Sequence, residues 1–466
     1  MSRVKREKRQ ERKSTLSDRH IDVHLVPPLE ILHAHVTKAL CDEVFGELRT
    51  TERERKWSLY ALSRFWIAVI LRAPPSLSQL LQLMRGRDLE GFLPEVSASA
   101  ESFFMKCKDF SPVFFAEVHR RFIERVLPEA PKCFAGQVAH LQKKFADIVV
   151  IDGSRLDKVR HRLKILWGEK AAILPGCILA VYDLFRGITR QVWFDGDAAA
   201  SEFTRATLAV QCLEKGTLAL ADRLYASSVE LFDLLDGSGS FGVFRRNKTL
   251  SIKLVRLLES RKTKVGLLED WLVEAGTGEA TRQLRLIRLT KGKKVYEALT
   301  NVLDPKRLSA QDVVDLYPLR WTVERLFFDL KVVLNLEQFY AANPNAVAMQ
   351  VFAAAMVHAA FRVAQADVSK QVKLPPEEIS PHKLFPLLAF TSIKLIESEF
   401  LFDETCKANR GVKLKKPSLR DLPGTVVSLK YLRVQRRRGV RKERKYDIGR
   451  RKWKSFKKIK GARKLT

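Results

Sequence analysis

The chain has 466 residues, of which 46% are hydrophobic and 29% are charged, and its formal net charge at pH 7 is +31. This balance is typical of a folded globular protein and excludes a largely disordered or membrane-embedded chain, while the length favours two or three domains. The positive charge gathers at the two ends: residues 407–466 hold 24 lysines and arginines against three acidic residues, and residues 1–13 hold seven against two. Such ends indicate a polyanionic partner, most commonly nucleic acid.

Two further features bear on where the protein acts. No apolar segment follows the basic start, so the sequence does not predict a secretory signal. The most apolar run, at 347–361, is interrupted by Gln350 and His358 and is too short to span a bilayer. We therefore expect a cytoplasmic protein that makes no membrane contact.

Helical signals fill the first part of the chain. After a basic tail at 1–28, helical periodicity and helix punctuation predict an all-helical N-terminal domain at 29–140. Such a domain could recognise DNA ends through one of its helices, or serve only as a cap packed on the rest of the protein. The pattern leaves both interpretations open.

From residue 147 onward the pattern changes to short apolar runs of strand length, separated by turn signals. They predict three strands, a helix, a strand, a helix and a strand, which is the order of a ribonuclease-H-like mixed α/β fold. We expect this core to occupy 141–365. The predicted strands lie at 147–152, 176–184, 190–194, 216–222 and 240–246, and the helices at 198–214 and 227–235.

Residues 249–303 interrupt that order with lysine- and arginine-rich, partly alternating sequence, which predicts a mainly β insertion. Ser309 and Asp312 then resemble a capping box at the start of a long helix that runs to about residue 335. Helices are also expected at 345–365 and 383–397. The chain should end in a C-terminal helical and basic region at 366–466.

Two predicted strands end in a carboxylate: the first in Asp152 and the fourth in Asp222. Neighbouring strands of one sheet would bring these like charges together, and divalent metal ions would relieve their repulsion. A pair of metal ions can activate one oxygen and stabilise another in phosphoryl transfer. The alternative is that each aspartate ends its strand because aspartate suits turns.

A third carboxylate lies in the sequence YPLRWTVERLFFDLK. At 100° per residue, the side chains of Tyr317, Arg320, Glu324 and Lys331 fall within roughly 60° of one another on a helix. An adjoining apolar stripe would dock this helix on the sheet. The alternative is a surface helix on which Arg320 and Glu324 form an exposed pair, and Pro318 suggests that the helix begins there.

The spacing Y-x2-R-x3-E-x6-K, downstream of aspartates in VVIDGS and LALADRLY, resembles the signature of bacterial insertion-sequence DDE transposases of the insertion-sequence-four group. The resemblance extends over about 147–360. It implies that Asp152, Asp222 and Glu324 are the catalytic residues and ligands of two Mg²⁺ ions, for which Mn²⁺ may substitute; a hard cation suits all-carboxylate ligation.

The resemblance further implies that Arg320 and Lys331 bind terminal DNA phosphates and that Tyr317 lies near the transferred end. The activity would be cut-and-paste transposition, carried out by a homodimer on terminal inverted repeats and target DNA. By loose analogy, Trp271 in the insertion could stack on a base, although a core tryptophan is an equally good interpretation.

Two other functions fit the same residues. The chain could be a catalytically inactive DNA-binding protein derived from a transposase and kept for its basic surfaces. It could also be a structure-selective nuclease that cleaves DNA without joining it. Terminal inverted repeats beside the coding sequence would favour the transposase over both.

Overall fold

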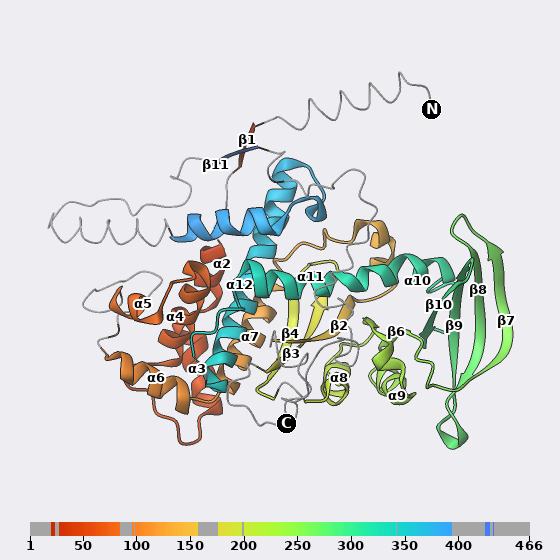
Figure 1. The fold of residues 1–466 in the computed structure, drawn as a ribbon, viewed down its shortest axis with the longest axis horizontal. Coiled ribbons are helices and arrows are strands. Elements are labelled where there is room, and N and C mark those ends of the chain that lie inside the picture. The colour runs from red at the N-terminus through yellow and green to blue at the C-terminus, as the bar shows by residue number, and fades with distance from the viewer. Residues whose placement is uncertain are drawn as a thin grey trace, which may run out of the picture.

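The computed structural model describes residues 20–23, 28–83, 96, 98–156, 176–197, 200–341, 343–393, 425–428 and 432. Most of the predicted basic tail at 1–28 and of the basic C-terminal residues lies outside these ranges. Two short strands, β1 (His20–Val23) and β11 (Thr425–Ser428), pair antiparallel with each other (Figure 1). Segments from the two ends of the sequence therefore lie side by side.

Helices fill the described part of the N-terminal region, as the punctuation predicts. Thr37, Ser58 and Ser99 each accept a hydrogen bond from a backbone N–H in the first turn of a helix, which satisfies a donor that has no partner within the helix. The helices are α2 (Pro28–His35), α3 (Lys38–Leu48), α4 (Leu59–Arg72), α5 (Leu77–Leu83), α6 (Ala100–Asp109) and α7 (Val113–Val126), followed by the 3₁₀ segment η1 (Gly136–Lys143).

A nine-stranded sheet forms the centre of the described chain, with the order β4-β3-β2-β5-β6-β10-β9-β8-β7. β2 pairs parallel with β5, and β5 pairs parallel with β6, whereas the other neighbours are antiparallel. The strands are β2 (Ile148–Arg155), β3 (Cys177–Asp183), β4 (Thr189–Asp195), β5 (Leu218–Ala221), β6 (Phe241–Arg245), β7 (Ile252–Lys262), β8 (Leu267–Ala275), β9 (Arg282–Lys291) and β10 (Lys294–Thr300).

The succession of elements along the chain confirms the predicted order of three strands, a helix, a strand, a helix and a strand. β3 and β4 form the expected hairpin, whose turn contains Gly187 with φ at +71°, a conformation that favours glycine. α8 (Glu202–Gln211) precedes β5, and α9 (Glu230–Gly237) follows the 3₁₀ turn η4 (Arg223–Ala226) and precedes β6. The architecture is therefore mixed α/β.

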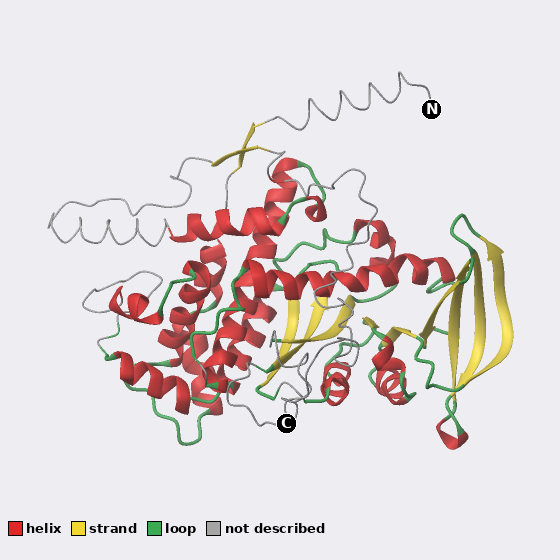
Figure 2. Cartoon of the chain, in the orientation of Figure 1, coloured by secondary structure: helices red, strands yellow, loops and turns green. Residues whose placement is uncertain are grey.

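The alternating segment after β6 forms four antiparallel strands, β7 to β10, with one short 3₁₀ turn, η5 (Gly278–Ala280), between β8 and β9. β10 pairs with β6, so these strands extend the central sheet and do not form a separate one. Figure 2 shows them as long strands that project from the helical part of the molecule.

Helices cover both faces of the central strands. Ile148 and Val150 of β2 pack into the larger hydrophobic core, to which α10, α11 and α12 contribute, whereas Val149 and Ile151 pack into a smaller core with α8 and α9. Figure 1 shows α8 and α9 on one side of the strands and α11 on the other. A functional side chain can therefore approach the strands from either face.

The helical run after β10 is interrupted, although the pattern predicts one long helix. The predicted capping box of Ser309 and Asp312 is present at its start. Pro318, which lacks a backbone N–H donor, falls in a 3₁₀ segment. The run consists of α10 (Ala310–Leu316), η6 (Tyr317–Trp321), α11 (Thr322–Phe328) and the π-helical turn η7 (Asp329–Val333).

The next helix, α12 (Pro344–Val372), is longer than the predicted 345–365 and has 29 residues. Within the described ranges it is one helix whose length and composition would allow it to cross a membrane, but 94% of the apolar window is buried inside the protein. It packs against α4, α7 and β4 and belongs to the larger core. A final helical segment at 381–393 overlaps the predicted 383–397.

Candidate active site

Asp152 and Asp222 occupy equivalent positions on neighbouring parallel strands. β2 and β5 pair in register from Ile148 opposite Leu218 to Val150 opposite Leu220, so two more residues bring Asp152 level with Asp222. Both aspartates therefore lie at one end of the sheet, as predicted. One detail of the prediction is wrong: Asp152 does not end its strand, because β2 continues to Arg155 by pairing with β3 alone.

The two aspartates also share a face of the sheet. Side chains alternate between faces along a strand. Val150 and Leu220, each two residues before an aspartate, both pack into the larger core. Asp152 and Asp222 therefore point toward that face, where α11 packs against β2.

α11 brings a third carboxylate to the same end of the sheet. Val323, Leu326 and Phe327 are buried in the larger core and dock the helix. Glu324 lies beside this buried stripe with its side chain half exposed, and its carboxylate is within electrostatic range of Asp222. The apolar stripe predicted from the sequence thus holds Glu324 near both strands.

Arg320 joins carboxylates from two elements. Its Nη1 lies 2.8 Å from Asp152 Oδ2, and its Nη2 lies 3.5 Å from Glu324 Oε1. Its guanidinium carbon is 5.1 Å from the centre of the exposed Trp321 ring. Because Arg320 is buried and also binds the sheet, the alternative of a surface helix with an exposed Arg320–Glu324 pair is wrong.

Tyr317 is buried beside the carboxylates. Its ring packs against Tyr296 of β10, with 5.2 Å between the ring centroids, and its hydroxyl finds no hydrogen-bond partner of ordinary geometry among the described residues. Burial raises the pKa of Tyr317 to about 12; the positive charge of Arg320 opposes the rise and the negative charge of Asp222 adds to it. The phenol is therefore protonated at neutral pH and can donate a hydrogen bond to an anionic ligand.

The π-helical turn η7 carries Lys331 to the end of β2. Lys331 Nζ donates to Ser154 Oγ at 2.7 Å and to the carbonyl oxygen of Arg155 at 2.6 Å. A π-helical turn rotates the following side chains relative to an ideal α-helix, so the position of Lys331 does not follow from α-helical spacing. The structure still brings Lys331 to the strand that carries Asp152.

The site holds excess negative charge. Burial raises the pKa of Asp152 to about 7; Arg320 and the Gly153 N–H oppose this rise, whereas Glu202 and Glu324 add to it. Burial also raises the pKa of Glu324, against the effect of Arg320 and with a further contribution from Asp222. Arg320 thus compensates only part of the carboxylate charge, and further positive charge would stabilise the ionised site.

The side chains suit metal ions in their chemistry but do not converge on one point. Among the described residues, no group of three or more histidine, cysteine, aspartate or glutamate side chains is placed to hold a metal ion. Carboxylate oxygens are nonetheless the ligands that hard divalent cations prefer. Asp152, Asp222 and Glu324 therefore fit such ions as a donor set, provided that their oxygens move toward one another.

Sequence reasoning missed Glu202 and Tyr225. Glu202 begins α8, and its Oε1 accepts a hydrogen bond from the Tyr225 hydroxyl at 2.9 Å. Tyr225 closes the segment LALADRLY, but no spacing singles it out, and Glu202 belongs to no motif. Trp271 lies on β8, where its side chain packs against the smaller core; this favours the structural interpretation of that residue.

Comparisons with known proteins agree with this geometry. Residues 143–359 match the family model described as the transposase DDE domain. A protein of Sinorhizobium fredii (strain NBRC 101917 / NGR234) named "Putative transposase y4zB" is 30% identical over 132 residues, which cover 27% of this chain and 36% of that protein. The match thus spans little more than a third of that relative. These findings support a transposase DDE domain at 143–359, the segment that contains Asp152, Asp222 and Glu324.

Proposed function

We propose that the chain is a DDE transposase of the insertion-sequence-four group with a ribonuclease-H-like core, and that it catalyses cut-and-paste transposition. The observation that carries the proposal is the meeting of Asp152, Asp222 and the Arg320–Glu324 pair at one end of the sheet, inside the segment that matches a transposase DDE domain. The strand order β4-β3-β2-β5-β6, with helices on both faces, supports the assignment of the core.

Asp152, Asp222 and Glu324 would hold two Mg²⁺ ions, for which Mn²⁺ would substitute. Such ions, when bound, activate an oxygen nucleophile and stabilise the charge that develops on the leaving oxygen. The three carboxylates would remain ionised and orient the scissile phosphate between the two strands and α11. The excess negative charge around Asp152 supports this role, because a site built only for stability would balance its buried charges.

Arg320 and Lys331 would bind phosphates of the DNA end. In the absence of DNA, Arg320 pairs with Asp152 and Glu324, and Lys331 binds the end of β2. Once the carboxylate charge is neutralised, the guanidinium group is free to bind two phosphate oxygens. The Tyr317 hydroxyl would donate a hydrogen bond near the transferred end.

The proposed reaction exchanges phosphodiester bonds. A water oxygen first bonds to phosphorus as the bond to the 3′ oxygen breaks, which leaves a 3′-hydroxyl and a 5′-phosphate. This hydroxyl attacks a phosphate of the opposite strand and displaces its 3′ oxygen, so that the flanking DNA leaves with a 3′-hydroxyl and the end closes as a hairpin. Water then hydrolyses the hairpin phosphodiester and restores the 3′-hydroxyl, which attacks a phosphate of the target DNA and displaces the 3′ oxygen of the target strand. Arg320 and Lys331 would stabilise the negative charge of each transition state.

The rest of the chain would position the DNA. We expect the helical domain at 29–140 to recognise terminal inverted repeats, and the basic tail at 1–28 and the region at 366–466 to hold the duplex. The net charge of +31 supports a polyanionic partner. A homodimer would hold two ends at once, in the cytoplasm and at the nucleoid.

The test is incubation of labelled DNA from the ends of the protein's own genomic locus with Mg²⁺ and target plasmid. The proposal predicts nicked, hairpin and joined products. Cleavage without any joining would indicate a structure-selective nuclease, and binding without cleavage would indicate an inactive DNA-binding protein; either result would overturn the proposal.

A further inference from the structure

A fourth carboxylate, that of Glu202, reaches the active-site end of the sheet from the opposite face. Glu202 is the first residue of α8, which packs into the smaller core through Ala206, Ala209 and Val210. The side chains of Asp152 and Asp222 face the larger core on the other side. Glu202 therefore approaches this end of the sheet from the side away from α11.

Glu202 contacts both segments that carry the aspartates. Its Oε1 accepts a hydrogen bond from the hydroxyl of Tyr225, a buried residue three positions after Asp222. The same carboxylate lies against Gly153, where an added Cβ would be 2.8 Å from Glu202 Cδ and 3.0 Å from Oε2. A residue larger than glycine would displace the carboxylate from β2. Glu202 thus bridges β2 and the turn after β5.

The negative charge of Glu202 acts on the site. The Glu202 carboxylate lies against Gly153, the residue that directly follows Asp152, so its negative charge is held next to the backbone of the metal-binding strand. A neutral glutamine could accept the same hydrogen bond from Tyr225 without repelling Asp152. The hydrogen bond from Tyr225 therefore does not explain why residue 202 carries a negative charge, whereas attraction of cations to the site does.

We propose that Glu202 is a positioning residue of the active site: it fixes the spacing between the segments that carry Asp152 and Asp222, and its charge strengthens their hold on divalent cations. This inference rests on the proposed function, because it assumes that the aspartates bind metal ions. Tyr225 anchors one oxygen of Glu202, and Gly153 leaves space for the carboxylate.

The test measures Mn²⁺ binding to the full-length protein by the loss of the electron paramagnetic resonance signal of free Mn²⁺. Glu202→Gln keeps a hydrogen-bond acceptor but removes the charge, and should weaken Mn²⁺ binding about tenfold or more, as changes around metal ligands commonly do. Tyr225→Phe keeps the charge but removes its anchor, and should weaken binding by less. Glu230→Gln, at the exposed start of α9, is the matched control and should bind as the wild type does.

Thermal unfolding of the same variants separates positioning from structural support. A purely structural Glu202 would lower the melting temperature in Glu202→Gln and leave Mn²⁺ affinity unchanged, which would overturn the inference. If Glu202→Gln does not fold, Tyr225→Phe decides: weakened Mn²⁺ binding supports the inference, and wild-type affinity overturns it. Mn²⁺ binding by the wild type separates the two proposals. If the wild type binds Mn²⁺ and Glu202→Gln binds it equally well, only the role of Glu202 is overturned. If the wild type does not bind Mn²⁺, the proposed metal chemistry is overturned as well.

Discussion

Arg320 is the cation on which the charge balance of the candidate site depends. It is buried and lies within 2.8 Å of Asp152 and 3.5 Å of Glu324, so its removal would leave buried carboxylate charge with less compensation. A variant at Arg320 would therefore change both the stability of the site and any contact with DNA. Lys331 offers a second test, since it donates to the Ser154 hydroxyl and to the backbone carbonyl of Arg155 at the end of β2.

We expect Lys331→Ala to weaken binding to DNA from the protein's own ends and to reduce its salt dependence. The loss of one phosphate contact should lower the slope of log K against log salt concentration by about 0.9. Fluorescence anisotropy would measure the DNA-binding constant at several salt concentrations from about 50 to about 200 mM. Lys38→Ala, at an exposed lysine on α3, serves as the control. A wild-type slope in Lys331→Ala would remove Lys331 from the DNA interface.

The sequence identifies those residues of the candidate site that lie in motifs. Asp152 and Asp222 follow apolar runs of strand length, and Arg320 and Glu324 belong to the spacing that resembles the transposase signature. The structure brings all four to one end of the sheet. Glu202 could not be found in this way. Its place depends on a contact with Gly153 across the end of the sheet, and such contacts between distant segments leave no period in the sequence.

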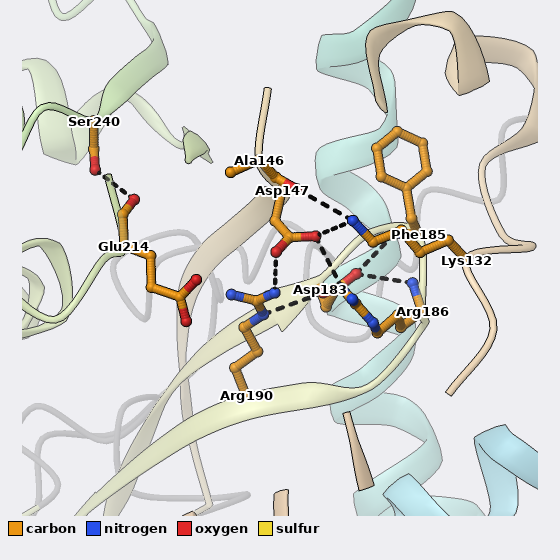
Figure 3. Close-up of polar contacts among 9 residues, drawn as sticks. All are labelled: Lys132, Ala146, Asp147, Asp183, Phe185, Arg186, Arg190, Glu214 and Ser240. Atoms are coloured by element: carbon orange, nitrogen blue, oxygen red, sulfur yellow. Dashed lines mark hydrogen bonds and ion pairs between the residues drawn. The ribbon is translucent and has the colours of Figure 1, made fainter. Parts of the chain in front are cut away.

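At the scale of elements, a buried ion cluster fixes β2 and β3 at the end opposite the active site (Figure 3). Arg186 Nη1 lies 2.9 Å from both Asp147 Oδ1 and Asp183 Oδ2, Arg190 Nε lies 3.1 Å from Asp183 Oδ2, and Lys132 Nζ lies 2.8 Å from Asp147 Oδ1. Burial alone would raise the pKa of Asp147, but these cations hold it below its ordinary value. The cluster therefore depends on its ionised aspartates.

Asp183→Asn should destabilise the protein by about 3–5 kcal/mol, because Arg186 and Arg190, both largely buried, would then share the charge of Asp147 in place of two carboxylates. Asp183 is fully buried and also accepts hydrogen bonds from the backbone N–H groups of Phe185 and Arg186, so solvent cannot replace the lost charge. Denaturant unfolding would measure the change. Asp42→Asn, in an exposed pair on α3, should leave the unfolding free energy almost unchanged; equal stability of the two variants would contradict a role for the cluster.

Strands were easier to predict than the helix that carries Glu324. The central strands are short apolar runs buried on both faces, and their order along the chain follows from those runs. The helical run from Ala310 to Val333 instead changes from α to 3₁₀, back to α and then to a π turn. Pro318 explains the first change in part, but the π turn reflects tertiary contacts of η7 that the residue pattern does not encode.

At the scale of the whole molecule, the helical N-terminal region and α12 share one core. His119 of α7 is buried there, with 6.0 Å between the centroids of its ring and the Phe352 ring of α12, and within the described part of the chain its Nε2 has no hydrogen-bond partner. Burial lowers the pKa of His119 from 6.5 to about 4. The folded protein therefore holds this imidazole neutral at a pH where the unfolded chain protonates it.

This difference makes stability depend on pH. Between pH 4 and pH 6.5 the imidazole of His119 binds a proton in the unfolded chain but not in the folded protein. The stability contributed by neutral, buried His119 is therefore complete above pH 6.5 and is lost as the pH falls toward 4. The loss over this window should be about 3 kcal/mol. The free energy of unfolding, measured at several pH values, should depend less on pH in His119→Leu than in the wild type. His382→Leu, at an exposed histidine, is the control, and equal slopes in all three proteins would contradict the prediction.

The larger-scale arrangement was only partly predictable. Composition and periodicity predict the helical start, the mixed core and the mainly β segment. They do not predict that this segment extends the central sheet through β10, because β10 pairs with β6 across three intervening strands, and such distant pairing leaves no pattern in the sequence. α12 is also longer than predicted. Because most of its residues are buried, it lacks the regular polar face from which the extent of a helix can be read in a sequence.

We propose that Asp152, Asp222 and Glu324 act together in DNA cleavage. The most direct measurement compares Mg²⁺-dependent cleavage of labelled end DNA by the wild type with Asp152→Asn, Asp222→Asn and Glu324→Gln, and with Glu279→Gln at an exposed turn as the control. We expect cleavage by the wild type and the control, loss of cleavage in the three site variants, and nearly unchanged DNA binding in all five proteins. Cleavage retained by any one of the three site variants would contradict the proposal.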